Sequence, residues 1–164
     1  MYYDENGIND TRSEVRLLSI VDTTSSSDGY IKSKEEVNAF LNQAKKCLSD
    51  DSLWKINDET WAGGRVNKTQ AFMAEKNLHD DDVAEVIREL QVANYCYTAD
   101  DRNVNFPNES FWFFGITRLI IDSEEKLYIK LKIRKFEDDF LLVMSFHPEQ
   151  PTSSDNELTF PYAK

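Results

Sequence analysis

A histidine near the carboxyl end of the chain is the side chain best suited to proton transfer. His147 is one of two histidines among 164 residues, and it stands next to Pro148 just beyond the last predicted strand. An imidazole changes charge near neutral pH, so it can accept or donate a proton there. This residue type at a strand end predicts general acid–base catalysis. The alternative is an exposed strand-end histidine without a catalytic role.

A tyrosine and two lysines occupy alternate positions of an earlier predicted strand. Tyr128, Lys130 and Lys132 lie on one face of that strand, because side chains alternate between its two faces. A phenol and two ammonium groups on one face could hold a phosphate. A solvated face without a ligand is the other interpretation. Further cations that could reach the same neighbourhood are Arg118, Arg134, Arg65 and Lys68.

The second histidine, His79, precedes the run Asp80–Asp82. A histidine beside three aspartates could indicate a metal site. Acidic residues are also favoured in the first turn of a helix, and we predict a helix N-terminus here rather than a metal site. The other acidic pairs lack the spacing of a calcium loop, and the chain has no P-loop, nucleophile elbow or dinucleotide fingerprint. We expect neither a metal nor a cofactor.

The charge balance limits the choice of partner. Nineteen basic residues stand against thirty acidic ones, which gives a formal net charge of −11. Such a chain repels free nucleic acid unless its basic residues gather on one face. It would also favour a strongly basic protein partner. Simple solubility is the alternative explanation.

The compartment is predicted to be cytoplasmic. The first ten residues are polar and acidic, unlike a signal peptide, and no apolar run is long enough to span a membrane. Cys47 and Cys96 are too few for a disulfide framework or a zinc site, and both fall at apolar positions. We expect them to be small buried side chains.

Helices are predicted first and strands afterwards. Ser33 and Glu36 form a capping box, and an amphipathic helix should run from there to about residue 49. A short helix is expected over about 67–75, and another begins near Asp80. Period-two patterns then predict strands over 95–98, 111–121, 127–133 and 140–146, with a weaker one over 53–56.

Short connections between the last three strands predict an antiparallel meander, because parallel strands need long crossovers. The expected fold class is therefore α+β, with N-terminal helices packed on a C-terminal antiparallel sheet. A polar run of turn-forming residues precedes the first clear helix. We accordingly predict an N-terminal extension over residues 1–32, acting as an arm or linker, and one domain over 33–164.

Several stretches of this domain are similar to one known family. Phe111–Gly115 resembles the tryptophan–glycine strand of MqsR-like toxins, and Leu127–Leu131 resembles their tyrosine–lysine strand. Val143–His147 is similar to the closing Ser-Phe-His strand of one branch, whose chains end soon after with a pair like that in Phe160–Tyr162. Asn67–Gln70, followed by a capped helix, matches the family's order of elements. The resemblance covers about residues 33–164.

The resemblance implies a RelE/MqsR-like fold, RNA cleavage without a metal, and neutralisation by an antitoxin. The predicted catalytic residues are His147, Tyr128 and Lys130. The residues predicted to bind RNA phosphates are Lys132, Arg118, Lys68 and Arg65. Three positions depart from the founding branch: Tyr97 stands near the place of a lysine, Phe113 replaces a glutamine, and His147 replaces a lysine, as in the histidine branch.

Three functions are compatible with these residues. The first is an endoribonuclease of the MqsR-like toxin type. The second is a phage-encoded inhibitor of the anti-CRISPR type, which would bind a basic nucleoprotein such as a Cas9-like enzyme and could cut its bound RNA. The departures at Tyr97 and Phe113 favour the third, an inactive binding module that kept the fold.

Overall fold

The computed structural model describes residues 29–60, 66–135, 137–149 and 157–163. By compactness the chain forms two units. One unit contains Tyr97–Phe111 with the described residues up to Ile31, and the other contains Lys32–Cys96 and Trp112–Lys164. The predicted extension over residues 1–32 falls mostly outside the described residues and stays a prediction.

Three helices precede the long strands, as the sequence predicts. They are α2 (Lys34–Leu48), α3 (Lys68–Lys76) and α4 (Asp80–Arg88). The capping box at the start of α2 is confirmed, since the Glu36 backbone N–H donates to Ser33 Oγ over 3.1 Å and the Ser33 N–H donates to Glu36 Oε1 over 3.0 Å. These two bonds satisfy backbone donors that the first helical turn leaves unpaired.

Five strands form a mixed sheet in the order β2-β6-β5-β4-β3. The predicted meander is confirmed, because β4 (Ser110–Ile120), β5 (Ser123–Lys135) and β6 (Asp139–Pro148) pair antiparallel. The other strands are β2 (Trp54–Ile56) and β3 (Tyr95–Asp100). One feature was not predicted: β2 pairs parallel with Leu141–Val143 of β6.

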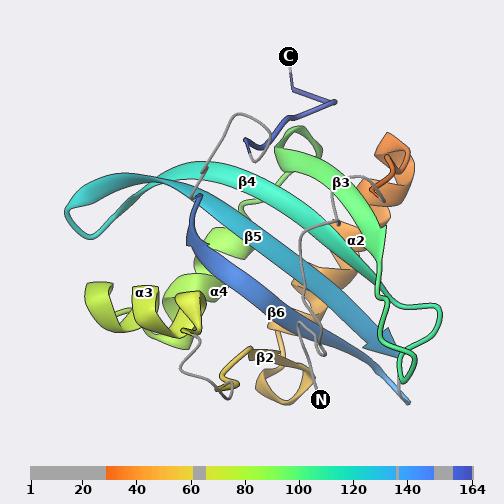
Figure 1. Cartoon of the computed structure of the whole chain (residues 1–164), viewed down its shortest axis with the longest axis horizontal. Helices are drawn as coiled ribbons and strands as arrows, with labels where there is room; N and C mark the ends of the chain where they lie inside the picture. The colour runs from red at the N-terminus through yellow and green to blue at the C-terminus, as the bar shows by residue number, and fades with distance from the viewer. Residues whose placement is uncertain (1–28, 61–65, 136, 150–156, 164) are drawn as a thin grey trace. The chain divides into compact units, whose positions relative to one another are not determined.

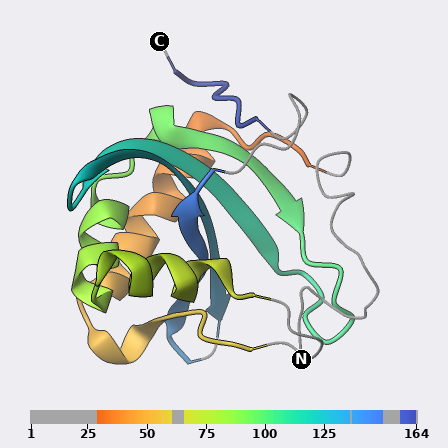
Figure 2. The ribbon, with the colours of Figure 1, turned by 60° about the vertical axis from the view of Figure 1, so that its left-hand side comes forward.

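The helices cover one face of the sheet in the larger unit. Figure 1 shows β4, β5 and β6 as neighbouring ribbons with α2 and α4 behind them, and Figure 2 shows all three helices on the same side. Phe40 of α2 stacks on Trp112 of β4 with ring centroids 4.3 Å apart. The expected α+β architecture is therefore confirmed. Side chains buried between helices and sheet include Leu41, Ile87, Phe114, Ile129, Leu131, Val143 and Phe146.

A tight turn joins β4 to β5 and is fastened to the end of α3. Lys76 Nζ lies 3.0 Å from Asp122 Oδ1 and 2.9 Å from Ser123 Oγ. β5 extends beyond the predicted 127–133 at both ends, and β4 is shifted by one residue from the predicted 111–121. Only Ile121 and Asp122 separate the two strands. Ile121 adopts φ 59°, a left-handed conformation that is rare for a β-branched residue.

No helix in the described part of the chain is long and apolar enough to cross a membrane.

The smaller unit is held together around Tyr30. Its backbone N–H and carbonyl exchange two 2.8 Å hydrogen bonds with Thr98. The Tyr30 hydroxyl donates to Asp100 Oδ1 over 2.6 Å. Tyr97 belongs to this unit, where its ring lies 2.6 Å from the point that a Cβ at Gly29 would occupy. The close approach explains the glycine at that position, since any side chain would meet the ring.

Candidate functional site

A β-bulge in β6 determines the direction in which His147 points. Val143 pairs with Leu131 and Ser145 pairs with Lys130, so that Met144 has no residue opposite it in β5. An extra residue reverses the facing of the side chains beyond it, because side chains alternate. His147 consequently pairs with Tyr128 on the sheet face opposite the helices. We call this the tyrosine face; it carries Tyr128, Lys130, Ser145 and His147.

The rings of Tyr128 and His147 form a stacked pair. Their centroids lie 5.2 Å apart and their planes differ by 23°. Phe113 of β4 meets Tyr128 edge-on at 6.0 Å, and Lys130 Nζ lies 5.5 Å from the centre of the Phe113 ring. Phe113 thus supports both polar side chains from the neighbouring strand. The structure brings together three of the predicted site residues, namely His147, Tyr128 and Lys130.

The surroundings of His147 favour its neutral form. Burial lowers the pKa of His147 below its ordinary value of 6.5, and the positive charges of Lys68 and Lys130 lower it further. The hydrogen bond with the Pro148 carbonyl acts in the opposite direction, and burial is the largest effect. At neutral pH the ring is therefore uncharged and can accept a proton.

One hydrogen bond fixes the tautomer of the neutral ring. His147 Nδ1 lies 2.9 Å from the Pro148 carbonyl oxygen. A carbonyl can only accept, so Nδ1 carries the proton in this bond. Nε2 then holds the free electron pair, and it is the atom of His147 that can act as a base.

The start of α3 is attached to β6 one residue before His147. The buried backbone N–H of Phe146 donates to Thr69 Oγ1 over 2.9 Å. Asn67 caps the helix, because its Oδ1 accepts from the backbone N–H groups of Thr69 and Gln70, each over 3.1 Å. Lys68 stands between Asn67 and Thr69 in the sequence, and its side chain is exposed. This attachment explains how Lys68 acts on the pKa of His147.

Asn57, which follows β2, holds the bulge from the other side. Its backbone N–H donates to the Val143 carbonyl over 2.9 Å, and its Nδ2 donates to the Met144 carbonyl over 3.4 Å. Its own carbonyl accepts from Gln70 Nε2 over 3.0 Å. The bulge therefore lies in a network shared by β2, α3 and β6. Asn57 and Thr69 were missed as positioning residues, because their roles depend on contacts distant in sequence.

Cations are concentrated along β5. The strand carries five basic side chains and two acidic ones, whereas the whole chain carries an excess of eleven negative charges. On the tyrosine face, alternation places Lys126, Lys130, Lys132 and Arg134 with Tyr128, against the single acid Glu124. The acidic chain thus has a locally basic strand at this face.

The outcomes for the other predicted phosphate-binding residues differ. Arg118 lies on the helix side of β4, where its guanidinium forms two contacts with the Glu89 carboxylate, so that its predicted place beside Tyr128 is wrong. The reason is the strand register. Gly115 is the partner of Tyr128, and Arg118 is three residues further along β4, so its side chain points to the opposite face of the sheet. Lys132 is on the tyrosine face but only 2% exposed. Arg65 lies outside the described residues.

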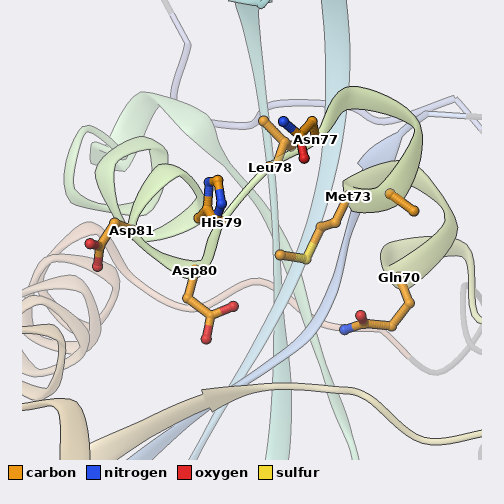
Figure 3. A pocket seen from close by; sticks show the side chains of 8 residues that line it. Gln70, Met73, Asn77, Leu78, His79, Asp80 and Asp81 are labelled. Carbon is orange, nitrogen blue, oxygen red and sulfur yellow. The ribbon is translucent and has the colours of Figure 1, made fainter.

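The second histidine lies in a different environment, at the junction of α3 and α4. Its backbone N–H donates to Asp82 Oδ2 over 2.8 Å, and its side chain is 80% exposed. Figure 3 shows the carboxylates of Asp80 and Asp81 pointing apart rather than converging on His79. Within the described residues, no group of three or more acidic, histidine or cysteine side chains could hold a metal ion. The predicted helix N-terminus is confirmed.

Both cysteines are poor candidates for nucleophiles. Both are buried, as predicted. Burial raises the pKa of the Cys96 thiol to about 12, with a smaller effect from the charge of Glu149. Burial also raises the pKa of Cys47. A thiol that stays protonated is a poor nucleophile.

Comparison with known proteins does not assign this chain to a family. No family model, curated protein or solved structure matches the chain. The function must therefore be argued from the side chains of the tyrosine face.

Proposed function

We propose that this chain is a metal-independent endoribonuclease of the MqsR-like type. The proposal depends above all on the stacked pair of Tyr128 and His147, with Lys130 and Lys68 acting on the same ring. The motif resemblance over β4, β5 and β6 supports it, because the stretches that resemble the toxin strands contain Tyr128, Lys130 and His147. The substrate is single-stranded RNA.

The reaction begins with attack by a ribose 2′-hydroxyl on the adjacent phosphorus. His147 Nε2 takes the hydroxyl proton as the bond from O2′ to phosphorus forms. The bond from phosphorus to the 5′-oxygen breaks, and the neutral Tyr128 hydroxyl gives its proton to that oxygen. The products are a 2′,3′-cyclic phosphate and a free 5′-hydroxyl. No oxidant or metal is consumed.

The lysines stabilise the charge that develops on the phosphate. Lys130 lies between Tyr128 and Lys132 along β5, and Lys68 approaches from the start of α3. Fixed cations around a developing negative charge are among the largest contributions to catalysis of this kind. Burial, and to a smaller extent the charges of Lys68 and Lys130, lowers the pKa of His147 and so favours the neutral ring that a base requires.

The test is cleavage of a single-stranded RNA in the presence of EDTA. The expected products end in a 2′,3′-cyclic phosphate, and a substrate with 2′-deoxyribose at the cleaved position should be inert. Tyr128→Phe keeps the ring stacked on His147 but removes the acid, so cleavage should slow by roughly 10²–10⁴-fold. The proposal fails if the wild type leaves RNA intact, or if Tyr128→Phe cuts as fast as the wild type.

A second candidate is an inhibitor of a basic nucleic-acid enzyme. The observation that favours it is the net charge of −11, with three exposed aspartates in the first turn of α4. An acidic surface suits the positively charged channel of a Cas9-like nucleoprotein, which could also present its RNA to the tyrosine face. An antitoxin would be the expected partner in the toxin interpretation.

The inhibitor candidate is tested by the salt dependence of its complex with a Cas9-like nucleoprotein. A complex with a Cas9-like nucleoprotein should form at low ionic strength and weaken as salt screens the charges. Asp80→Asn combined with Asp81→Asn should weaken it, whereas Tyr128→Phe should not. Failure of the two purified proteins to associate at low salt, measured by gel filtration, removes this candidate.

A further inference from the structure

The C-terminal segment packs on the tyrosine face next to the candidate site. Gly115 of β4 pairs with Tyr128 of β5, so a side chain at position 115 would point to the same face. A Cβ there would meet Leu158 at 2.8 Å and the Phe160 ring at 2.9 Å. Leu158 and Phe160 occupy the space that a side chain would take, so any larger residue at position 115 would displace them.

The segment is fixed at several points. The Leu158 backbone N–H donates to Glu149 Oε2 over 2.8 Å. The Tyr162 hydroxyl donates to the Lys32 carbonyl over 2.6 Å, and its ring stacks on Tyr95 with centroids 6.1 Å apart. Phe160 lies between these anchors, so its position against Gly115 is well defined.

Phe160 nevertheless stays 38% exposed. A large apolar ring is held on the sheet with more than a third of its surface in solvent. Leu158, by comparison, is only partly exposed against the same glycine. Exposed aromatic rings beside cations are the usual stacking platforms for unpaired nucleobases.

The position of Phe160 suits a base next to the reacting phosphate. Gly115, Tyr128 and His147 form one row across three neighbouring strands. Strands are spaced by about 4.8 Å, which puts Gly115 about 10 Å from His147 along that row. Phe160 lies against Gly115 at one end of this row, and Lys130 occupies the next row.

We propose that Phe160 is a stacking subsite for an unpaired nucleobase of single-stranded RNA, adjacent to the phosphate held beside Tyr128 and His147. This inference rests on the proposed function and adds to it the binding of one base. The base stacks on the exposed part of the ring, and the Cζ edge of the ring lies against Gly115. Because every base has an aromatic face, the subsite selects for an unstacked strand rather than for one sequence.

The experiment measures binding separately from cleavage. A short fluorescent oligonucleotide with 2′-O-methyl ribose cannot undergo attack by its own hydroxyl, and its affinity is read by fluorescence anisotropy. Phe160→Leu keeps an apolar contact with Gly115 but removes the aromatic face, and it should weaken binding by roughly 5–150-fold. Phe160→Trp should restore wild-type affinity or exceed it.

Two controls make the outcome specific. Leu119→Ala removes another exposed apolar side chain, 70% exposed near the end of β4, and should leave the affinity unchanged. In a second control, each oligonucleotide of a series lacks one base. Loss of the base at one position should weaken binding to the wild type but should not weaken binding to Phe160→Leu. Circular dichroism melting checks that each variant is folded.

The possible results distinguish the two proposals. Wild-type binding that depends on Phe160, without cleavage of ordinary RNA, keeps the subsite and removes the ribonuclease. Cleavage with equal oligonucleotide affinity for wild type, Phe160→Leu and Phe160→Trp overturns the subsite alone. Absence of wild-type binding at low salt also overturns it.

Discussion

The two histidines of this chain lie among charged neighbours, but their environments differ in kind. His147 is half-buried between strands, stacked on Tyr128 and approached by two lysines. His79 is exposed at the start of α4, where its backbone N–H bonds with Asp82. The first environment controls the protonation and direction of the ring. The second environment engages the backbone N–H of His79 in the helix start and leaves most of its ring in solvent.

The difference shows that packing matters more than neighbouring charge for assigning chemistry. Three aspartates beside His79 look more like a site in the sequence than the apolar stretch around His147. Yet the aspartates serve the helix start, where carboxylates interact favourably with unpaired backbone N–H groups. The apolar stretch supplies the burial that lowers the pKa of His147.

The largest predicted effect is on RNA cleavage. His147→Ala removes the base and should slow cleavage by roughly 10²–10⁴-fold. His79→Ala is the matched control and should stay within about twofold of wild type, since the ring has no part in the proposed reaction. Rates are compared on one labelled RNA at neutral pH. Equal losses in both variants would remove the distinction between the two histidines.

The next effect concerns the attachment of α3 to β6. Thr69→Val leaves the buried Phe146 N–H without its acceptor and should lower the free energy of unfolding by about 1–3 kcal/mol. Thr117→Val on β4 is exposed and should change it by less than about 0.5 kcal/mol. Urea denaturation followed by circular dichroism gives both values. A neutral Thr69→Val would mean that this hydrogen bond does not hold β6.

A smaller loss is expected at the His79 region. Asp82→Ala removes the carboxylate that accepts from the His79 N–H and should lower stability by about 0.5–1 kcal/mol. Cleavage should be unaffected, because α4 contributes no residue to the tyrosine face. Asp81→Ala in the same turn is the comparison for charge alone. A loss of cleavage in Asp82→Ala would connect the two regions.

The smallest effect is a slope of stability with pH. The pKa of His147 is below 6.5 in the folded chain, so the unfolded chain binds the proton first as pH falls. Stability from this group is present above pH 6.5 and is lost as pH falls through the folded-state pKa. His147→Gln should flatten the dependence measured by urea denaturation from neutral pH to about pH 5. A steeper fall in His147→Gln would contradict the sign.

Local patterns predicted the scaffold well. Ser33 with Glu36 marks the start of α2, and alternation marks β4, β5 and β6, because caps and periodicity depend on residues close in the chain. The parallel pairing of β2 was not predictable, since a three-residue strand has little pattern of its own. Its partner lies more than eighty residues away, and only tertiary packing selects it.

The candidate site was predicted only in part. Alternation places Tyr128 and Lys130 together, but the position of Arg118 depends on the register with β5, which the sequence does not give. His147 reaches the same face because of the extra residue at Met144. The signal for it was present, since apolar Val143 and Phe146 are three apart rather than two. Recognising a bulge from that spacing requires knowing that both residues are buried.

The extra residue in β6 has an evolutionary consequence. Gain or loss of one codon between Val143 and Phe146 would exchange which of two adjacent side chains stands beside Tyr128, while the strand order stays the same. The proposed catalytic arrangement would therefore arise or disappear through an insertion too small to alter the topology. Among descendants of a common ancestor, the length of that interval would be more informative than the presence of a histidine.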